Sequence, residues 1–323
     1  MSDETIKSIP SNRLQFFPVM MFAVIMGLGG LTLVYERAHE VLGLSSLFYL
    51  VLKSITTVIF IFVVLTYIIK LFMYLDEVKK EFSHPIRINF FAAISISFLL
   101  ISAIYKNSID ISNILFYFGL FLHLFFTLNT LKYWINNNLE MKHSNPAWFI
   151  PIVGNLIVPV VGANHLDSMY LMFFFSIGIF FWIIMLSIIL NRIIFHNQFA
   201  PKFMPTLFIL IAPPSVGLIA YYKMTHSLDF FALILFNLGL FFTFLIFFMY
   251  KNFVKIKFFI SWWAFTFPMA TIALASILMY ELTNKDIYEF FSYFFSLVLT
   301  MIVLIVAYNT IVHMFKKEIC IME

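Results

Sequence analysis

The sequence predicts an all-α integral membrane protein with ten transmembrane helices, arranged as five helical hairpins. Hydrophobic residues make up 63% of the 323 residues and charged residues only 11%, and the mean hydropathy is +0.99. Soluble domains carry about 25% charged residues, enough to cover a core with a polar surface. This chain has too few charges for that, so most of its exposed surface must face lipid.

Ten apolar stretches approach the roughly 20 residues that an α-helix needs to cross the core of a bilayer. We place them at residues 14–35, 46–72, 88–105, 111–135, 147–163, 168–190, 204–223, 229–250, 256–280 and 288–313. Short breaks rich in charge or asparagine separate them, such as residues 76–81 and 136–138. We therefore expect one transmembrane domain over residues 14–313, flanked by the polar tails 1–13 and 314–323.

The distribution of Lys and Arg predicts the orientation, because cytoplasmic loops carry the excess of positive charge. Fifteen of the 20 Lys and Arg residues fall on the side that holds both termini, and Lys53 falls inside the second span. The opposite side has four, Arg37, Lys106, Lys223 and Lys285. We expect a multi-pass protein of the plasma membrane, the inner membrane in a bacterium, with both tails cytoplasmic. The basic residues form no stripe, so we expect no nucleic-acid partner.

Proline divides the ten spans into two kinds, because it occurs only in odd-numbered spans. These prolines are Pro18, Pro151, Pro159, Pro205, Pro213, Pro214 and Pro268, and Pro85 directly precedes the third span. Proline leaves backbone groups unbonded, and hydrocarbon cannot satisfy them unless protein or a water-filled cavity covers them. We therefore predict an inner ring of kinked odd helices that forms a pore, surrounded by an outer ring of even helices.

Small and polar residues also gather on the odd spans. They include Gly27, Ser95, Gly154, Asn155, Ser215 and Thr266. Any one of them is readily explained by close helix packing. Their joint occurrence on the kinked helices favours a central pathway. We therefore take them, together with Pro18, Pro151, Pro159, Pro213, Pro214 and Pro268, as candidate pore-lining or kink residues.

Several segments resemble a known family of membrane proteins. They are residues 17–18, 26–29, 84–97, 145–155, 212–217 and 261–268. The last of these, Ser-Trp-Trp-Ala-Phe-Thr-Phe-Pro, is the most specific, because chance rarely produces its spacing even in a Phe-rich sequence. Over nearly the whole chain, these segments are similar to the tellurite-resistance and dicarboxylate transporter family, which includes bacterial TehA and the plant slow-type anion channels.

The resemblance implies a homotrimer in which each subunit has its own pore. It also implies that Phe267, at the kink of the ninth helix, plugs that pore, with Phe265 as the alternative. Ala23 matches the small residue that leaves room for the ring. Some members have a proline in the third helix where this chain has Ala92 and Ala93, so the shape of that helix is an open question.

The placement of ionisable residues predicts a passive anion pathway. No Asp or Glu lies in the central part of any predicted span, so a cation has no partner there and proton coupling has no carrier. The positive ends of broken helices, the hydroxyls of Ser95 and Ser215 and the amide of Asn155 would instead favour an anion. We expect a channel for small inorganic or organic anions, gated by Phe267. The alternative is a carrier for C4-dicarboxylates such as malate, or an exporter of sulfite or tellurite-like anions.

Three other residues have ordinary explanations. The long side chain of Lys53 either lets its ammonium reach the membrane–water interface, or the ammonium attracts anions at the pore mouth. His123, in the middle of the fourth span, is expected to be a neutral packed or hydrogen-bonded residue, with proton transfer as the alternative. Cys320 is the only cysteine and is expected to be a free thiol.

The sequence has no metalloprotease helix or glycine-rich phosphate loop, so we expect neither an enzyme nor a cofactor.

Overall fold

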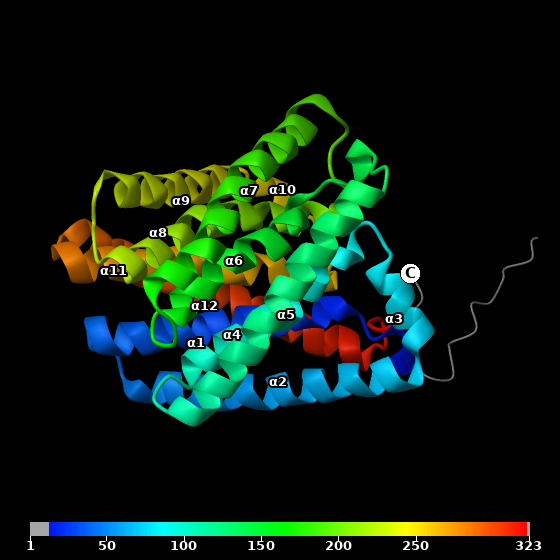
Figure 1. The fold of residues 1–323 in the computed structure, drawn as a ribbon, viewed down its shortest axis with the longest axis horizontal. Helices are drawn as coiled ribbons and strands as arrows, with labels where there is room; N and C mark the ends of the chain where they lie inside the picture. The colour runs from blue at the N-terminus through cyan, green and yellow to red at the C-terminus, as the bar shows by residue number, and fades with distance from the viewer. Residues whose placement is uncertain (1–12, 322–323) are drawn as a thin grey trace, which may run out of the picture.

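The computed structural model describes residues 13–321, and this part of the chain is built from helices without a strand. Within that range, nine helical segments are long and apolar enough to span a membrane, and Pro146–Gly162 is a shorter apolar helix. The protein is therefore an all-α membrane protein. Both ends of the described chain lie at the same end of the bundle (Figure 1). Residues 1–12 of the predicted N-terminal tail and residues 322–323 of the C-terminal tail lie outside the described residues.

Five helical segments are almost entirely buried. They are Val19–Leu42, Arg87–Ile104, Pro146–Gly162, Pro201–Thr225 and Ile260–Thr283. In the four longer ones, 78% to 83% of the most apolar stretch is buried, compared with 28% to 44% in the other five spans. All residues of Pro146–Gly162 except Val160 are buried. These five segments correspond to the odd-numbered spans, so the prediction of an inner ring of odd helices is confirmed.

Contacts between neighbours close the inner helices into a ring. Their α-helical parts are α1 (Phe22–Leu42), α4 (Ala92–Ile104), α6 (Phe149–Gly162), α8 (Ala212–Thr225) and α11 (Thr266–Thr283). Each packs against the next in this order, and α11 packs back against α1. A ring of five helices encloses an axis that side chains must either fill or leave open.

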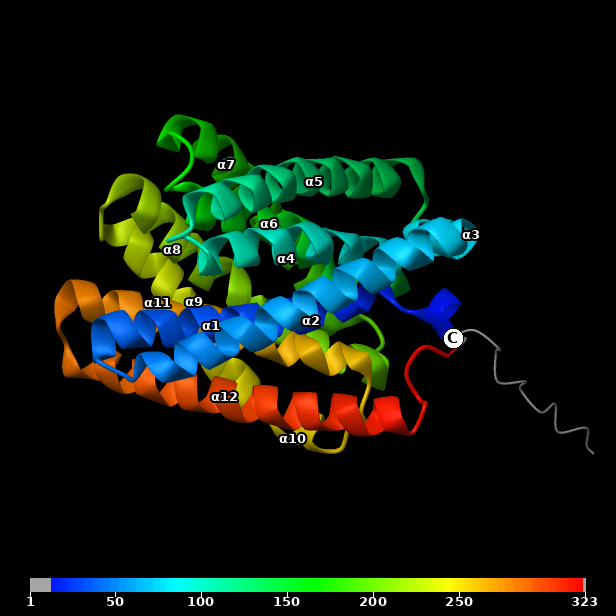
Figure 2. The same ribbon diagram turned by 90° about the horizontal axis from the view of Figure 1, so that it is seen from below.

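Five outer helices cover this ring. They are α2 (Ser46–Met73), α5 (Ile109–Asn136), α7 (Ser168–Phe195), α9 (Phe230–Phe248) and α12 (Asp286–Phe315). Each packs against the inner helix that precedes it in the chain, which gives five hairpins. Helices α5 and α12 lie on opposite sides of the bundle, with α4, α1 and α11 between them (Figure 2). The outer helices expose large apolar side chains, such as Phe72, Phe121 and Phe248, which suit contact with lipid.

Every inner segment begins as a 3-10 helix and continues as an α-helix. The 3-10 parts are η2 (Val19–Met21), η3 (Arg87–Phe91), η5 (Pro146–Trp148), η6 (Pro201–Ile211) and η7 (Ile260–Phe265). The five outer helices are α-helical throughout. A 3-10 turn is common at the N-terminal end of an α-helix, but the 11 residues of η6 exceed the about three or four of a usual run. The third predicted span, which is the segment Arg87–Ile104 in the structure, changes from 3-10 helix to α-helix at Ala92 although it contains no proline. The shape of this helix, which the sequence left open at Ala92 and Ala93, is thus the same as in the other inner segments.

The first span ends later than the sequence predicts. We expected it to end at residue 35, before Glu36, but α1 continues to Leu42. Glu36 is 4% exposed, and its carboxylate lies 3.2 Å from the Lys106 ammonium. A paired cation offsets part of the cost of burying a carboxylate, so Glu36 does not end the helix. Two short helices, α3 (Leu75–Phe82) and α10 (Lys251–Val254), occupy stretches that we had treated only as breaks.

A buried ion pair joins α3 to the start of the first inner segment. The side chains of Lys70 and Glu81 are 1% and 5% exposed, and Lys70 Nζ lies 2.7 Å from Glu81 Oε2. Lys70 also donates to the Phe17 carbonyl at 2.8 Å, and the Val19 backbone N–H donates to Glu81 Oε1 at 3.2 Å. The Tyr67 hydroxyl donates to Glu81 Oε2 at 3.1 Å. The pair thereby holds the backbone where the chain enters the bundle.

Candidate functional site

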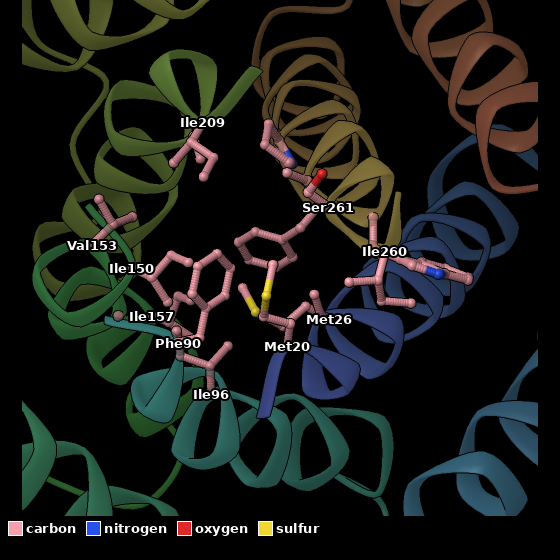
Figure 3. A pocket seen from close by; sticks show the side chains of 17 residues that line it. Met20, Met26, Phe90, Ile96, Ile150, Val153, Ile157, Ile209, Ile260 and Ser261 are labelled. Atoms are coloured by element: carbon pink, nitrogen blue, oxygen red, sulfur yellow. The ribbon is translucent and has the colours of Figure 1, made fainter. Parts of the chain in front are cut away.

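A cavity lies between the five inner segments. All five contribute to its wall, and the outer helices contribute none of its lining residues. The lining side chains labelled in Figure 3 are Met20, Met26, Phe90, Ile96, Ile150, Val153, Ile157, Ile209, Ile260 and Ser261. The inner ring therefore encloses open space, as a pore requires.

The cavity lies where the inner segments change from 3-10 helix to α-helix. Met20 and Ala23 flank the start of α1, and Ala264 and Phe267 flank the start of α11. A change of winding interrupts the regular fit of side chains between neighbouring helices. The space inside the ring thus coincides with the change from 3-10 helix to α-helix.

The wall of the cavity is almost wholly apolar. Ser261 is the one hydroxyl-bearing residue among the described lining residues, and its Oγ donates to the Lys202 carbonyl at 2.5 Å. None of the described lining residues is charged. A wall without an acid, a base or an activated nucleophile offers no groups for covalent catalysis. It can admit a small solute and expose it to the electrostatic field of the surrounding helices.

Phe267 and Pro268 lie in the wall of the cavity, at the start of α11. The Phe267 side chain is 9% exposed, and its Cδ2 lies 3.4 Å from where a Cβ on Gly30 would stand. Ala23 and Gly154 line the same cavity, so these four residues singled out from the sequence meet around one space. Phe267 therefore lies beside empty space, where a ring can block or clear a narrow path.

Phe265, the alternative plug, does not line this cavity. Its ring centre lies 4.7 Å from that of Phe208 and 5.9 Å from that of Phe253, both in edge-to-face contacts. Such contacts are typical of aromatic side chains packed in a core. Phe267, and not Phe265, therefore lies in the wall of the cavity.

Gly27 and Thr266 meet each other between α1 and α11. A Cβ on Gly27 would stand 2.2 Å from Thr266 Oγ1 and 2.8 Å from Trp263 Cε3. The Thr266 hydroxyl donates to the Trp263 carbonyl at 2.7 Å. Neither Gly27 nor Thr266 lines the cavity. Gly27 and Thr266 lie where α1 and α11 pack closely, because a small residue lets the two backbones approach each other.

The three polar residues expected to favour an anion are bonded within the helices. Ser95 and Ser215 donate their hydroxyls to carbonyls of their own segments, at 2.8 Å in both cases. Asn155 Nδ2 donates to the Pro151 carbonyl at 2.9 Å. All three side chains are fully buried, and none lines the cavity. Their bonds satisfy the backbone of the bent segments, and their contact with an anion stays a prediction.

The remaining candidate prolines lie at the start of inner helices or inside them. Pro18 directly precedes η2, and Pro213 and Pro214 lie in the first turn of α8. Pro151 lies in the first turn of α6, and Pro159 lies inside that helix. None of the five lines the cavity. These prolines belong to the inner segments that surround the cavity, but their side chains are not part of its wall.

His123 reaches from the outer helix α5 to the inner ring. Its side chain is fully buried, and its Nδ1 lies 2.8 Å from Ser95 Oγ. The ring occupies the space beside Gly154, where a Cβ would stand 2.1 Å from His123 Cε1. Because Gly154 lines the cavity, His123 stands directly behind the cavity wall.

Replacing Gly154 with alanine is expected to lower the free energy of unfolding by about 1 to 3 kcal/mol, as overpacking generally does. The new methyl group would collide with the His123 ring, which Ser95 holds in place. Thermal unfolding of the purified protein in detergent measures the loss. In a His123→Ala background the same Gly154→Ala change should cost much less. An equal cost in both backgrounds would show that His123 is not the obstacle.

Lys53 lies on the outer helix α2, away from the cavity. Its ammonium lies 4.2 Å from the ring centre of Tyr105 and 5.8 Å from that of Tyr49. Tyr105 directly follows the last residue of α4, so these cation–π contacts hold the charge at the end of the bundle opposite the termini. Anion attraction by Lys53 stays a prediction.

Most of the wall could not be singled out from the sequence. Met20, Met26, Phe90 and Ile209 line the cavity but are apolar residues within apolar spans. Met26 and Phe90 fall within the segments that carry the family resemblance, but no charge distinguishes any of the four from apolar residues that pack against a neighbouring helix. The one available signal is their nearness to a helix break, because the cavity follows the changes of winding.

The chain is similar to anion channels and transporters over most of its length. A family model described as a voltage-dependent anion channel matches residues 16–311. The S-type anion channel SLAH2 of Arabidopsis thaliana is 27% identical over 311 residues, which cover 94% of this chain and 60% of that protein. The tellurite resistance protein TehA homolog of Haemophilus influenzae is 28% identical over 299 residues, 90% of each chain. The guard cell S-type anion channel SLAC1 of Arabidopsis thaliana is 24% identical over 311 residues, which cover 93% of this chain and 56% of that protein. The chain thus spans 56% to 60% of the length of these two plant channels.

Proposed function

The chain belongs to the voltage-dependent anion channel family, and we propose that it passes small anions passively across the membrane. Membership of this family confirms the resemblance seen in the sequence. The proposed pathway runs along the axis of the inner ring and through its cavity. The observation that carries the proposal is an uncharged cavity that all five inner segments line, with Phe267 in its wall.

The direction of the helices explains why an uncharged cavity would favour anions over cations. All five inner segments run in the same direction, because an outer helix returns the chain between one inner segment and the next. Their N-terminal ends therefore lie at one end of the bundle, and most of the residues that line the cavity lie in the N-terminal halves of these segments. The N-terminus of a helix carries about half an elementary positive charge. No carboxylate belongs to the described lining residues, so five positive ends leave a potential that suits an anion.

Phe267 supplies a gate that needs no ionisable group. Its ring lies beside the cavity, and Pro268 follows it directly in the first turn of α11. Ala23 lines the same cavity from α1, and its methyl group leaves room for the ring to move. We propose that a change in the rotamer of Phe267 opens the path, and that the channel is nearly closed with the ring in its present position.

A channel and a coupled carrier predict different fluxes. For purified protein in planar bilayers, with chloride, nitrate and malate in turn, we expect a current that follows the voltage. Collapse of a pH gradient should leave this current unchanged, because no described lining residue is an acid or a base. Transport that stops when the gradient collapses would instead identify a coupled carrier, of malate-like dicarboxylates or of sulfite or tellurite-like anions.

We also propose the assembly and orientation expected from the sequence. The protein would be a homotrimer with one pore in each subunit, and the exposed apolar faces of its outer helices suit either lipid or a neighbouring subunit. Residues 1–13 and 314–323 would be cytoplasmic tails of a protein in the plasma or bacterial inner membrane. The excess of Lys and Arg on the side of both termini supports this orientation. The proposed transport needs neither a catalytic residue nor a cofactor.

A further inference from the structure

The end of the bundle opposite the termini carries a group of charged residues. They are Glu36, Arg37 and Glu40 in the last turns of α1, Lys106 just after α4, Lys223 in the last turn of α8 and Glu281 in the last turn of α11. The five inner helices place their C-terminal, electronegative ends here. An anion that uses the proposed pathway would be repelled at this mouth unless a cation compensates.

Two of the three cations in this group are committed to carboxylates. Arg37 bonds to Glu40 at 2.5 Å and also pairs with Glu281. Lys106 Nζ lies 2.8 Å from Glu40 and 3.2 Å from Glu36. Burial lowers the pKa of Lys106, but its hydrogen bonds and the charges of Glu40 and Glu36 outweigh this effect and raise the pKa overall. Arg37 and Lys106 are thus charged, and carboxylates already balance their charges.

Lys223 has a different set of contacts. Its ammonium donates one hydrogen bond, to the Val160 carbonyl in the last turn of α6, at 2.8 Å. Within the described part of the chain, no carboxylate forms an ion pair with it. An ammonium has three N–H donors, so two are left for another ligand. Lys223 is therefore the cation of this group that can receive an anion.

The hydrogen bond from Lys223 to Val160 has a simpler explanation, which covers only part of the ammonium. The bond to Val160 alone would explain a lysine that caps the end of α6, but it leaves the remaining two donors without a role.

We propose that the Lys223 ammonium binds a small monovalent anion at the mouth opposite the termini, as the entry or exit site of the pathway. The inference rests on the proposed channel function. One bare positive charge matches one negative charge, which suits an inorganic ion of the size of chloride or nitrate. The site also supplies the attraction that the apolar cavity lacks.

The test uses Lys223→Gln in a Phe267→Ala background, where the gate is expected to be open. Glutamine keeps an N–H donor for Val160 but removes the charge, so the helix cap is preserved. Chloride current is recorded in planar bilayers at about 0.01 M and about 1 M salt, where the Debye length is about 30 Å and about 3 Å. We expect Lys223→Gln to lower the low-salt current by about tenfold, as for removal of an electrostatic attraction, and to have little effect at high salt.

The matched control is Lys285→Gln, which removes an exposed lysine on the same side of the membrane and should leave the current unchanged. Lys223→Arg, which keeps the charge, should retain the low-salt current. A Lys223→Gln channel whose low-salt current equals that of its Phe267→Ala parent, or which loses the same fraction of current at both salt concentrations, would overturn the inference while the channel function stands. A Phe267→Ala parent that carries no anions would overturn the channel function, and the inference with it.

Discussion

Replacing Phe267 with alanine is expected to produce a steady anion leak, with a conductance raised by about tenfold or more, which corresponds to a barrier lower by about 1.4 kcal/mol. The ring lies in the wall of a cavity that all five inner segments line, so its removal widens the path directly. The cavity holds no charged group among its described lining residues that would block an anion by itself. Current from the purified variant in planar bilayers, compared with the unmodified protein, measures the effect.

Phe265→Ala is the matched control for this prediction. Phe265 and Phe267 are two residues apart, and both side chains are 9% exposed. Phe265 packs against Phe208 and Phe253 and does not line the cavity. Its replacement should therefore lower stability without opening a leak. A leak from Phe265→Ala and none from Phe267→Ala would assign the gate to the other ring.

Replacing Glu81 with alanine is expected to lower the free energy of unfolding by about 3 to 5 kcal/mol, as for a broken buried ion pair. The change would leave the Lys70 ammonium, which is 1% exposed, without its carboxylate. It would also leave the Val19 N–H without its acceptor, at the point where the chain enters the inner ring. Thermal or denaturant unfolding of the purified protein in detergent measures the loss.

Glu77→Ala is the control for the loss of a carboxylate from the same short helix. Glu77 pairs with Lys80 at 2.7 Å, but the Lys80 side chain is 72% exposed. Water screens an exposed pair and weakens it, so this change should have only a small effect on stability. The double variant Lys70→Met with Glu81→Met should cost less than Glu81→Ala, since no unpaired charge remains. Equal losses of unfolding free energy from Glu81→Ala and Glu77→Ala would show that the pair of Lys70 and Glu81 does not stabilise the fold.

The division into inner and outer helices could be predicted from the sequence, because it follows from the chemistry of proline in lipid. Pro159 and Pro268, for example, lie in segments that the structure buries, and the proline-free span that contains Phe121 and Phe125 lies outside. The regular change from 3-10 to α-helix in every inner segment was not predicted. The segment that begins at Arg87 makes this change without an internal proline, so composition gave no signal for it.

The identity of the lining residues was harder to predict, because the sequence of a wholly apolar span does not show which face of the helix points into the cavity. Ser95 and Asn155 were natural candidates to contact an anion, yet their side chains bond to carbonyls of the bent backbone. Hydroxyl and amide groups have short-range alternatives of this kind, and a sequence does not show which one is used. Phe267 was found by its motif alone, since 44 phenylalanines differ in nothing else that the sequence displays.

The most direct test of an anion pathway inside the inner ring is the reversal potential of the Phe267→Ala channel. With a tenfold gradient of potassium chloride across the bilayer, we expect the current to reverse near the equilibrium potential of chloride, about 59 mV from zero. Reversal near the potential of potassium, or no current above that of a protein-free bilayer, would contradict it.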